Sequence, residues 1–168
     1  MGLITHFVAA LAPRLGHGGA GQVVSLATIA AILGRIGTGF VIDRVDPRLA
    51  TSLTLAVQIA GVALLATTAS DGGLSLGGVL FGLGVGNLVT LPSLVLQREW
   101  PREQFAGLIS LLLAVNQFTF AFGPALIGVV RDLTGSYAPA LGCCIALELV
   151  AAVWILMGPG VPTARRRP

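Results

Sequence analysis

The chain has 168 residues, of which 55% are hydrophobic, and a mean hydropathy of +0.91. Charged residues make up 10% of it, against roughly 25% in a typical soluble domain. So few charges cannot form the polar shell that a soluble domain of this size needs. The composition excludes an ordinary soluble domain and predicts an all-α integral membrane protein, because a helix of about 20 apolar residues crosses a bilayer.

Six apolar segments follow one another along the chain. The first, 2–12, has about half the length of a span, and we expect Pro13 to end it. Five full spans are expected, at 19–41, 50–69, 74–97, 105–130 and 138–158. The first segment lacks the basic start and the clear cleavage site of a signal peptide. The simpler interpretation is a spanning helix whose first half is missing, so we expect a fragment: a helix bundle over 1–158 and a basic tail over 159–168.

The positions of the arginines predict the orientation in the membrane. All ten basic residues are arginines, and the expected spans alternate in direction. If the 42–49 turn is cytoplasmic, the arginines on the inside are Arg35, Arg44, Arg48, Arg98, Arg102, Arg165, Arg166 and Arg167, and those on the outside are Arg14 and Arg131. Basic residues accumulate on the cytoplasmic side of membrane proteins, so we expect a cytoplasmic C-terminus. This topology accounts for the basic charge, and no nucleic-acid partner is expected.

Few side chains could support catalysis or metal binding. His6 and His17 have no paired acid within reach by sequence, and the adjacent Cys143 and Cys144 lack the spacing of metal ligands. The glycine-rich run 82–86 is similar to a nucleotide-binding fingerprint, but that fingerprint follows a strand and opens a helix, whereas this run lies inside a span. We therefore expect no enzyme activity, no cofactor and no metal site.

The span 74–97 has two overlapping patterns. Gly78, Gly82 and Gly86 recur every four residues, so they share a helix face that a neighbouring backbone can approach closely. A polar stripe lies on an overlapping arc and consists of Gly86, Asn87, Thr90, Ser93 and Gln97. Pro92 is expected to kink the helix. Two interpretations stay open: a helix that lines a cavity, with Asn87 and Thr90 on a solute path, or plain helix packing.

Polar amides also lie within the span 105–130. Asn116, Thr119 and Gly123 share one face, while Gln117 points about 100° away. Because amides are costly to expose to lipid, we expect Asn116 and Gln117 to face the bundle interior or a water-filled path. A structural role as helix-packing hydrogen bonds is the alternative.

Glu148 is the only acid deep within a span. An ionisable group in a membrane is a functional candidate by default, so Glu148 is a candidate proton site. The alternative is a structural acid that is protonated or paired with a group that the sequence does not identify. Gln58, near the middle of the span 50–69, is a weaker candidate for substrate contact than Asn116 and Gln117.

Two stretches resemble the major facilitator superfamily of transporters. The first is Gly39-Phe-Val-Ile-Asp43-Arg44-Val-Asp46-Pro47-Arg48, which resembles the loop signature G-x-x-x-D-R-x-G-R-R, with Arg35 four residues before it. The second, Gly123-Pro124-x-x-x-Gly128-x-x-x-Asp132-x-Thr134-Gly135-Ser136-Tyr137, is similar to the end of the eleventh helix in many bacterial members. Asp46 and Pro47 depart from the loop signature.

The resemblance implies the C-terminal half of a twelve-helix bundle, with a truncated helix seven and complete helices eight to twelve. It implies alternating-access transport of a small solute in a bacterial inner membrane, together with the missing N-terminal half of the same transporter. Proton coupling and an organic-anion substrate are further expectations from the resemblance, because the pattern Asp132-x-Thr134-Gly135 recurs in monocarboxylate-type members. Such a half is expected to be inactive alone. A non-transporting scaffold or assembly subunit, or a dimeric half-size transporter, are the alternatives.

The resemblance also assigns a gating role to the loop of Arg35, Gly39, Asp43, Arg44 and Arg48. Gly39 lets helix ends cross closely, and Asp43 is expected to cap the helix that begins near Gln104 or to pair with an arginine. The alternative is that these charges only set the topology.

Overall fold

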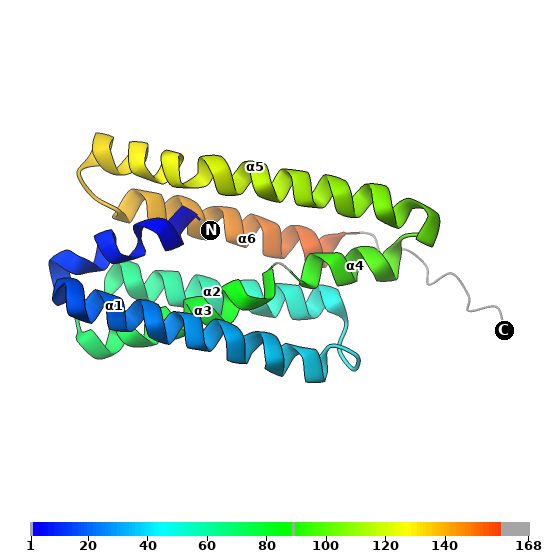
Figure 1. Cartoon of the computed structure of the whole chain (residues 1–168), viewed down its shortest axis with the longest axis horizontal. Helices are drawn as coiled ribbons and strands as arrows, with labels where there is room; N and C mark the ends of the chain where they lie inside the picture. The colour runs from blue at the N-terminus through cyan, green and yellow to red at the C-terminus, as the bar shows by residue number, and fades with distance from the viewer. Residues whose placement is uncertain (1, 89, 159–168) are drawn as a thin grey trace.

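Every regular element of the chain is a helix in the residues that the computed structural model describes, 2–88 and 90–158. The helices are α1 (Gly2–Val41), α2 (Pro47–Thr67), α3 (Asp71–Leu88), α4 (Leu91–Glu99), α5 (Arg102–Thr134) and α6 (Ala138–Met157) (Figure 1). Five stretches are long and apolar enough to cross a membrane: α1, α2, α3 with α4, α5 and α6. The predicted all-α membrane fold is confirmed.

The first helix breaks later than predicted. Its hydrogen-bonded turns continue past Pro13, and the break lies at Gly16, whose φ of 70° and ψ of 170° are not helical. A positive φ is open to glycine because it has no Cβ. The chain reverses direction there, so residues 2–15 run back along residues 17–41 (Figure 1). The prediction that Pro13 ends the first helix was therefore wrong.

The span predicted at 74–97 is two helices. α3 ends at Leu88, and α4 begins at Leu91 with Thr90 as its N-cap residue. Pro92 thus lies in the first turn of α4, where its missing N–H is one of the donors that a helix start leaves unpaired anyway. The predicted kink is a complete break, and the polar stripe does not run along one continuous helix.

The glycine face of α3 packs directly on α1. This face consists of Gly78, Gly82 and Gly86. They meet, in that order, Val23, Ala27 and Ala31 of α1, which have the same four-residue spacing. A Cβ at Gly82 would lie 2.1 Å from the carbonyl oxygen of Ala27, and a Cβ at Gly86 would lie 2.2 Å from that of Ala31. The two backbones are therefore in direct contact, which supports the packing interpretation of this face.

The short first segment of α1 lies at the centre of the bundle. The phenyl rings of Phe7 and Phe81 stack with their centroids 5.4 Å apart. They belong to a buried apolar cluster drawn from α1, α2, α3 and α6: Phe7, Leu11, Ala20, Val23, Val62, Leu65, Leu74, Phe81 and Leu141. Beside it, Arg14 donates to the carbonyl oxygens of Leu65 and Thr68 at 3.1 and 3.2 Å, which satisfies acceptors at the C-terminal end of α2.

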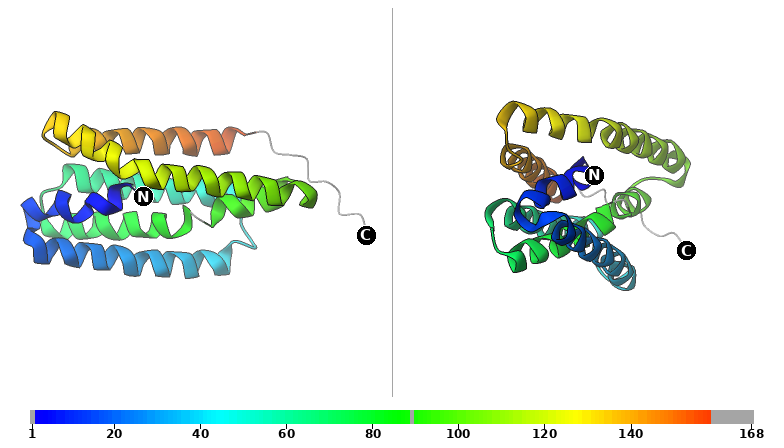
Figure 2. Two further views of the ribbon diagram at one scale, coloured as in Figure 1. Left: turned by 45° about the horizontal axis from the view of Figure 1, so that its top comes forward. Right: turned by 60° about the vertical axis from the view of Figure 1, so that its left-hand side comes forward.

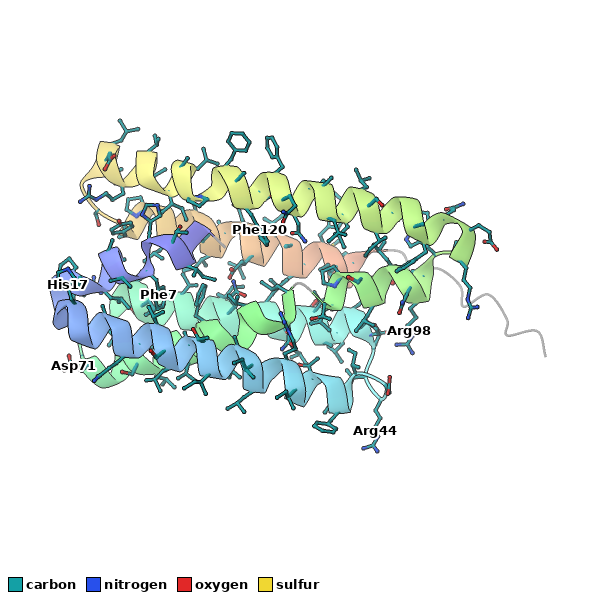
Figure 3. All side chains as sticks on the ribbon, viewed as in Figure 1. Phe7, His17, Arg44, Asp71, Arg98 and Phe120 are labelled. Carbon is teal, nitrogen blue, oxygen red and sulfur yellow. The ribbon has the colours of Figure 1, made fainter. Side chains whose placement is uncertain are left out.

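The chain changes direction from one span to the next, with α3 and α4 running the same way, so the bundle has two distinct ends (Figure 1). His17 and Asp71 lie at one end, and Arg44 and Arg98 lie at the other (Figure 3). We call the second the arginine-rich end; it holds the turns between α1 and α2 and between α4 and α5. Arg165, Arg166 and Arg167 lie outside the described residues. The cytoplasmic placement of this end stays a prediction.

Candidate functional site

At the arginine-rich end, Arg48 contacts two other helices. Its Nη2 donates to Oε2 of Glu99 at 2.9 Å, its Nε donates to Oε1 of the same carboxylate, and its Nη1 donates to the carbonyl oxygen of Gly158. Asp46 accepts from the Arg48 amide at 2.8 Å and so caps α2. We call Arg48, Glu99 and Gly158 the Arg48 clamp. It joins the start of α2 to the ends of α4 and α6 through a two-pronged guanidinium–carboxylate pair.

The sequence named Arg48 but missed Glu99. The two residues are 51 positions apart. The sequence feature that could have indicated Glu99 is its acidic side chain at the end of an apolar run. Arg35 is also engaged: its Nε donates to the carbonyl oxygen of Gly86 at 2.9 Å, which links α1 to the last turn of α3.

The remaining residues of the predicted gating loop point away from the bundle. Asp43, Arg44 and Gly39 are exposed, and the side chain of Arg44 extends beyond the arginine-rich end (Figure 3). Among the described residues, the carboxylate of Asp43 has no hydrogen bond or ion pair, and it does not cap the helix start near Gln104. The predicted latch is thus not formed in this structure, and the gating role of the loop stays a prediction.

Asn87 lies between helices. It is 6% exposed, and its Nδ2 is 3.4 Å from the carbonyl oxygen of Gly34 on α1 and 3.3 Å from that of Leu83 on α3. Thr90, by contrast, is exposed at the break between α3 and α4. The structure therefore separates two residues that the polar stripe had grouped, and it gives Asn87 the contacts of a helix-packing residue.

The amides of α5 lie on the most weakly packed helix. No residue of α5 is buried, and the helix runs along the outer edge of the bundle in Figure 1 and in the right-hand view of Figure 2. The hydroxyl of Thr119 is satisfied by the carbonyl oxygen of Val115 on its own helix. Asn116 is half-buried and Gln117 is exposed; within the described residues of the chain, neither amide has a hydrogen-bond partner.

Glu148 pairs with Gln58. Nε2 of Gln58 donates to Oε1 of Glu148 at 2.5 Å, across the contact between α2 and α6. Gln58 is 5% exposed. Oε1 of Gln58 and Oε2 of Glu148 are both buried and, among the described residues, without a hydrogen-bond partner. The sequence identified both residues as candidates but did not pair them, because the pairing depends on how α2 and α6 are rotated.

His6 makes two hydrogen bonds that were not predicted from the sequence. Its Nε2 is 3.0 Å from the carbonyl oxygen of Pro124, and its Nδ1 is 3.3 Å from the hydroxyl of Tyr137. Since a carbonyl only accepts, the neutral ring carries its proton on Nε2 in this arrangement. The ring also lies beside Gly128, with Cε1 of His6 3.7 Å from the place of its absent Cβ, an ordinary van der Waals distance. Pro124, Gly128 and Tyr137 all belong to the second signature, so this signature binds the first segment of α1 to α5 and α6.

Two curated proteins are similar to this chain. Over 119 residues, 70% of the chain, it is 31% identical to "Monocarboxylate transporter 2" of Homo sapiens and covers 25% of that protein. Over 79 residues, 46% of the chain, it is 38% identical to a Thauera aromatica protein named "Putative anionic 4-hydroxy-benzoate permease" and covers 48% of it.

The chain thus spans between a quarter and about half of the length of the curated relatives that it matches. No family model matches the sequence, and no solved structure matches it. Both relatives are transport proteins by name. Together with the five apolar helices, the similarity shows an integral membrane protein related to transporters.

Proposed function

We propose that the chain forms the C-terminal half of a secondary active transporter of the major facilitator type, which carries a small organic anion by alternating access. The observation that carries the proposal is the similarity of 70% of the chain to a quarter of a monocarboxylate transporter. The name of the second relative also refers to a carboxylate, 4-hydroxybenzoate. A carboxylated solute is the substrate class that agrees with both names. For the location we propose a bacterial inner membrane, as expected from the sequence.

The packing of α5 supports a second set of helices. A membrane-spanning helix cannot leave amides in hydrocarbon without hydrogen bonds. Asn116 and Gln117 on α5 lack partners among the described residues, so we assign them to a face that another half covers and that water and solute reach. Their amide N–H groups can donate to a carboxylate. Thr90, at the break before α4, is the third candidate on this path, and we assign Asn87 to helix packing.

The arginine-rich end suggests how the half moves. The Arg48 clamp joins α2, α4 and α6, so these helix ends move as one body. Asp43 and Arg44 project from the same end and are available to helices of the other half. Such charge–dipole contacts are favourable near helix ends, and they would form and break as the two halves rock. Positive-inside reasoning places this end, and the C-terminus, in the cytoplasm.

Uptake into proteoliposomes tests the proposal. The chain alone, and the chain joined in frame to the coding sequence upstream of it, are reconstituted and supplied with labelled lactate or 4-hydroxybenzoate under an inward proton gradient. We expect uptake only by the joined protein. Robust uptake by the chain alone would instead show a dimeric half-size transporter, and a joined protein that folds but carries neither solute would contradict the organic-anion proposal.

A matched pair of variants tests the path. Gln117→Ala in the joined protein should raise the substrate concentration for half-maximal uptake about tenfold, the effect of losing about 1.4 kcal/mol of hydrogen bonding. Gln22→Ala removes the same group from an exposed position of α1 and should change nothing. Equal effects of the two substitutions would exclude Gln117 from the solute path.

A further inference from the structure

The side chains of Gln58 on α2 and Glu148 on α6 form one hydrogen bond, but a second hydrogen bond between them would need one more proton. Gln58 donates through Nε2 to Oε1 of Glu148, and this contact leaves two buried oxygens, Oε1 of Gln58 and Oε2 of Glu148, without partners among the described residues. Both are acceptors when the carboxyl is ionised, so neither can satisfy the other. A carboxylic acid and a primary amide are complementary, because each then presents one donor and one acceptor. A single proton would therefore satisfy both orphaned atoms.

We propose that Glu148 and Gln58 form a proton-binding site that ties α6 to α2, in which Oε2 of Glu148 carries the proton and donates it to Oε1 of Gln58. The step is the protonation of one carboxylate, and no other bond forms or breaks. The site lies on α6 and α2, away from the amides of α5 that we assign to the solute path. It requires neither transport nor a second half.

The orientation of the amide does not weaken this argument. The oxygen and nitrogen of a glutamine side chain are assigned from their surroundings. With the amide of Gln58 reversed, its oxygen would lie 2.5 Å from Oε1 of Glu148. Two oxygens at that separation need a hydrogen between them, so the reversed arrangement also holds a proton.

The charged groups on the surrounding helices do not provide a counter-ion. On α2 the only charge is Arg48, which is bound to Glu99 and lies ten residues before Gln58, about 15 Å along the helix axis. On α6 the nearest titratable group is the thiol of Cys144, one turn before Glu148. The charges of α3, α4 and α5 stand at helix ends: Asp71, Arg98, Glu99, Arg102, Glu103, Arg131 and Asp132. The amino group at the start of the chain, which lies outside the described residues, also acts on this carboxylate. No charged side chain of the described residues neutralises it, and an ionised carboxylate without such a partner is strongly disfavoured in this setting, which favours the proton-bound form.

The neighbouring helix is shaped around the pair. A Cβ at Gly84 of α3 would lie 2.6 Å from Cβ of Gln58 and 2.8 Å from its Oε1, so α3 leaves space for the amide only because it has glycine there. Besides the Arg48 clamp at the helix ends, Oγ of Ser52 on α2 donates to the carbonyl oxygen of Ala152 on α6 at 3.3 Å. Loss of the proton removes a hydrogen bond and adds a charge at this contact, so it should loosen α6 from α2.

Infrared spectroscopy of the full chain in lipid nanodiscs tests the site. With carbon-13 glutamate, only three side chains contribute shifted carboxyl bands, those of Glu99, Glu103 and Glu148. We expect a protonated-carboxyl band at neutral pH that persists in Glu103→Gln, the same substitution at an exposed position, and disappears in Glu148→Gln. Carboxylate bands alone in the unaltered chain, or an acid band that survives Glu148→Gln, would overturn the proposal.

Two further measurements guard against a variant that fails to fold. Gln58→Leu retains Glu148 and removes its acceptor, so its acid band should move to higher wavenumber; an unchanged band would overturn the pairing. The second measurement uses pH. Because the proton stabilises the folded chain, raising the pH from mildly acidic to alkaline should lower the unfolding temperature of the unaltered chain. The unfolding temperature of Glu148→Gln should fall less, because its amide–amide pair keeps both hydrogen bonds at every pH. Equal pH dependence in the two proteins would overturn the proposal.

Discussion

The contact between α1 and α3 gives the most direct test of the fold. In Gly82→Ala, the new Cβ would lie 2.1 Å from the carbonyl oxygen of Ala27, a backbone atom that no side-chain rotation can move. Because carbon–oxygen contacts lie at about 3.3 Å or more, the two helices must separate by roughly 1 Å. A gap of that size forfeits up to about half of the dispersion energy of each contact along the seam.

The expected cost of Gly82→Ala is about 3 kcal/mol in the free energy of unfolding, at the upper end of the range for overpacked cores. Alanine's better helix propensity offsets up to about 1 kcal/mol of it. Gly78→Ala should cost less, because its Cβ would meet Cγ1 of Val23 at 2.5 Å, and a side-chain methyl can move. Gly107→Ala is the matched control: a Cβ there has nothing within 4 Å, so the propensity gain remains and this variant should be slightly stabilised.

Unfolding of the three variants by dodecyl sulfate in mixed micelles, followed by far-ultraviolet circular dichroism, provides the comparison. The reasoning predicts stability in the order Gly107→Ala, Gly78→Ala, Gly82→Ala, from highest to lowest. A Gly82→Ala protein as stable as Gly107→Ala would refute the direct backbone contact. A Gly78→Ala protein less stable than Gly82→Ala would refute the distinction between a fixed carbonyl and a mobile methyl group.

Three further substitutions test the other contacts. Glu99→Gln removes the charge that Arg48 binds, so backbone hydrogen exchange at the end of α4 should become several-fold faster, whereas Glu103→Gln should leave it unchanged; equal exchange would contradict the clamp. His6→Phe keeps a ring but loses both hydrogen bonds, so exchange over 2–15 should increase relative to 17–41, and unaltered exchange would show that packing alone holds this segment. Asp43→Asn in the complete transporter should lower turnover more than substrate affinity, and unchanged turnover would count against a gating role.

The sequence predicts the helices well where local chemistry decides them. The last helix begins at Ala138, as expected, after a turn that Gly135 makes with a φ of 69°. α2 begins at Pro47, three residues before the expected 50, because Asp46 caps it and proline suits its first turn. Both breaks were harder to place. A proline signals a helix limit only on average. Here the first break lies at Gly16, and the second lies between Leu88 and Leu91.

The side-chain pairs could not be read from the sequence, for a different reason. Arg48 with Glu99, Gln58 with Glu148, and His6 with Pro124 are separated by 51, 90 and 118 positions. Each pair depends on the rotation of two helices about their axes, which interlocking side chains set along the whole contact. The sequence could show only that a polar group in hydrocarbon needs a partner. It could not show which one.

The difference in packing between helices indicates where conformational change is cheapest. α3 meets both α1 and α2 through glycines that bring backbones into contact. Interfaces of that kind shift as units, because separating them loses many contacts at once. α5 has no buried residue and is held at one end by His6 and Tyr137 and at the other by its short turn from α4. A solute or a second half that binds Asn116 and Gln117 of α5 would therefore act on the helix whose displacement breaks the fewest packing contacts. The proton site joins α6 to α2, which is one of the tightly packed helices. The Arg48 clamp joins the same two helices at the arginine-rich end, so a change of charge at the proton site would also act on that end.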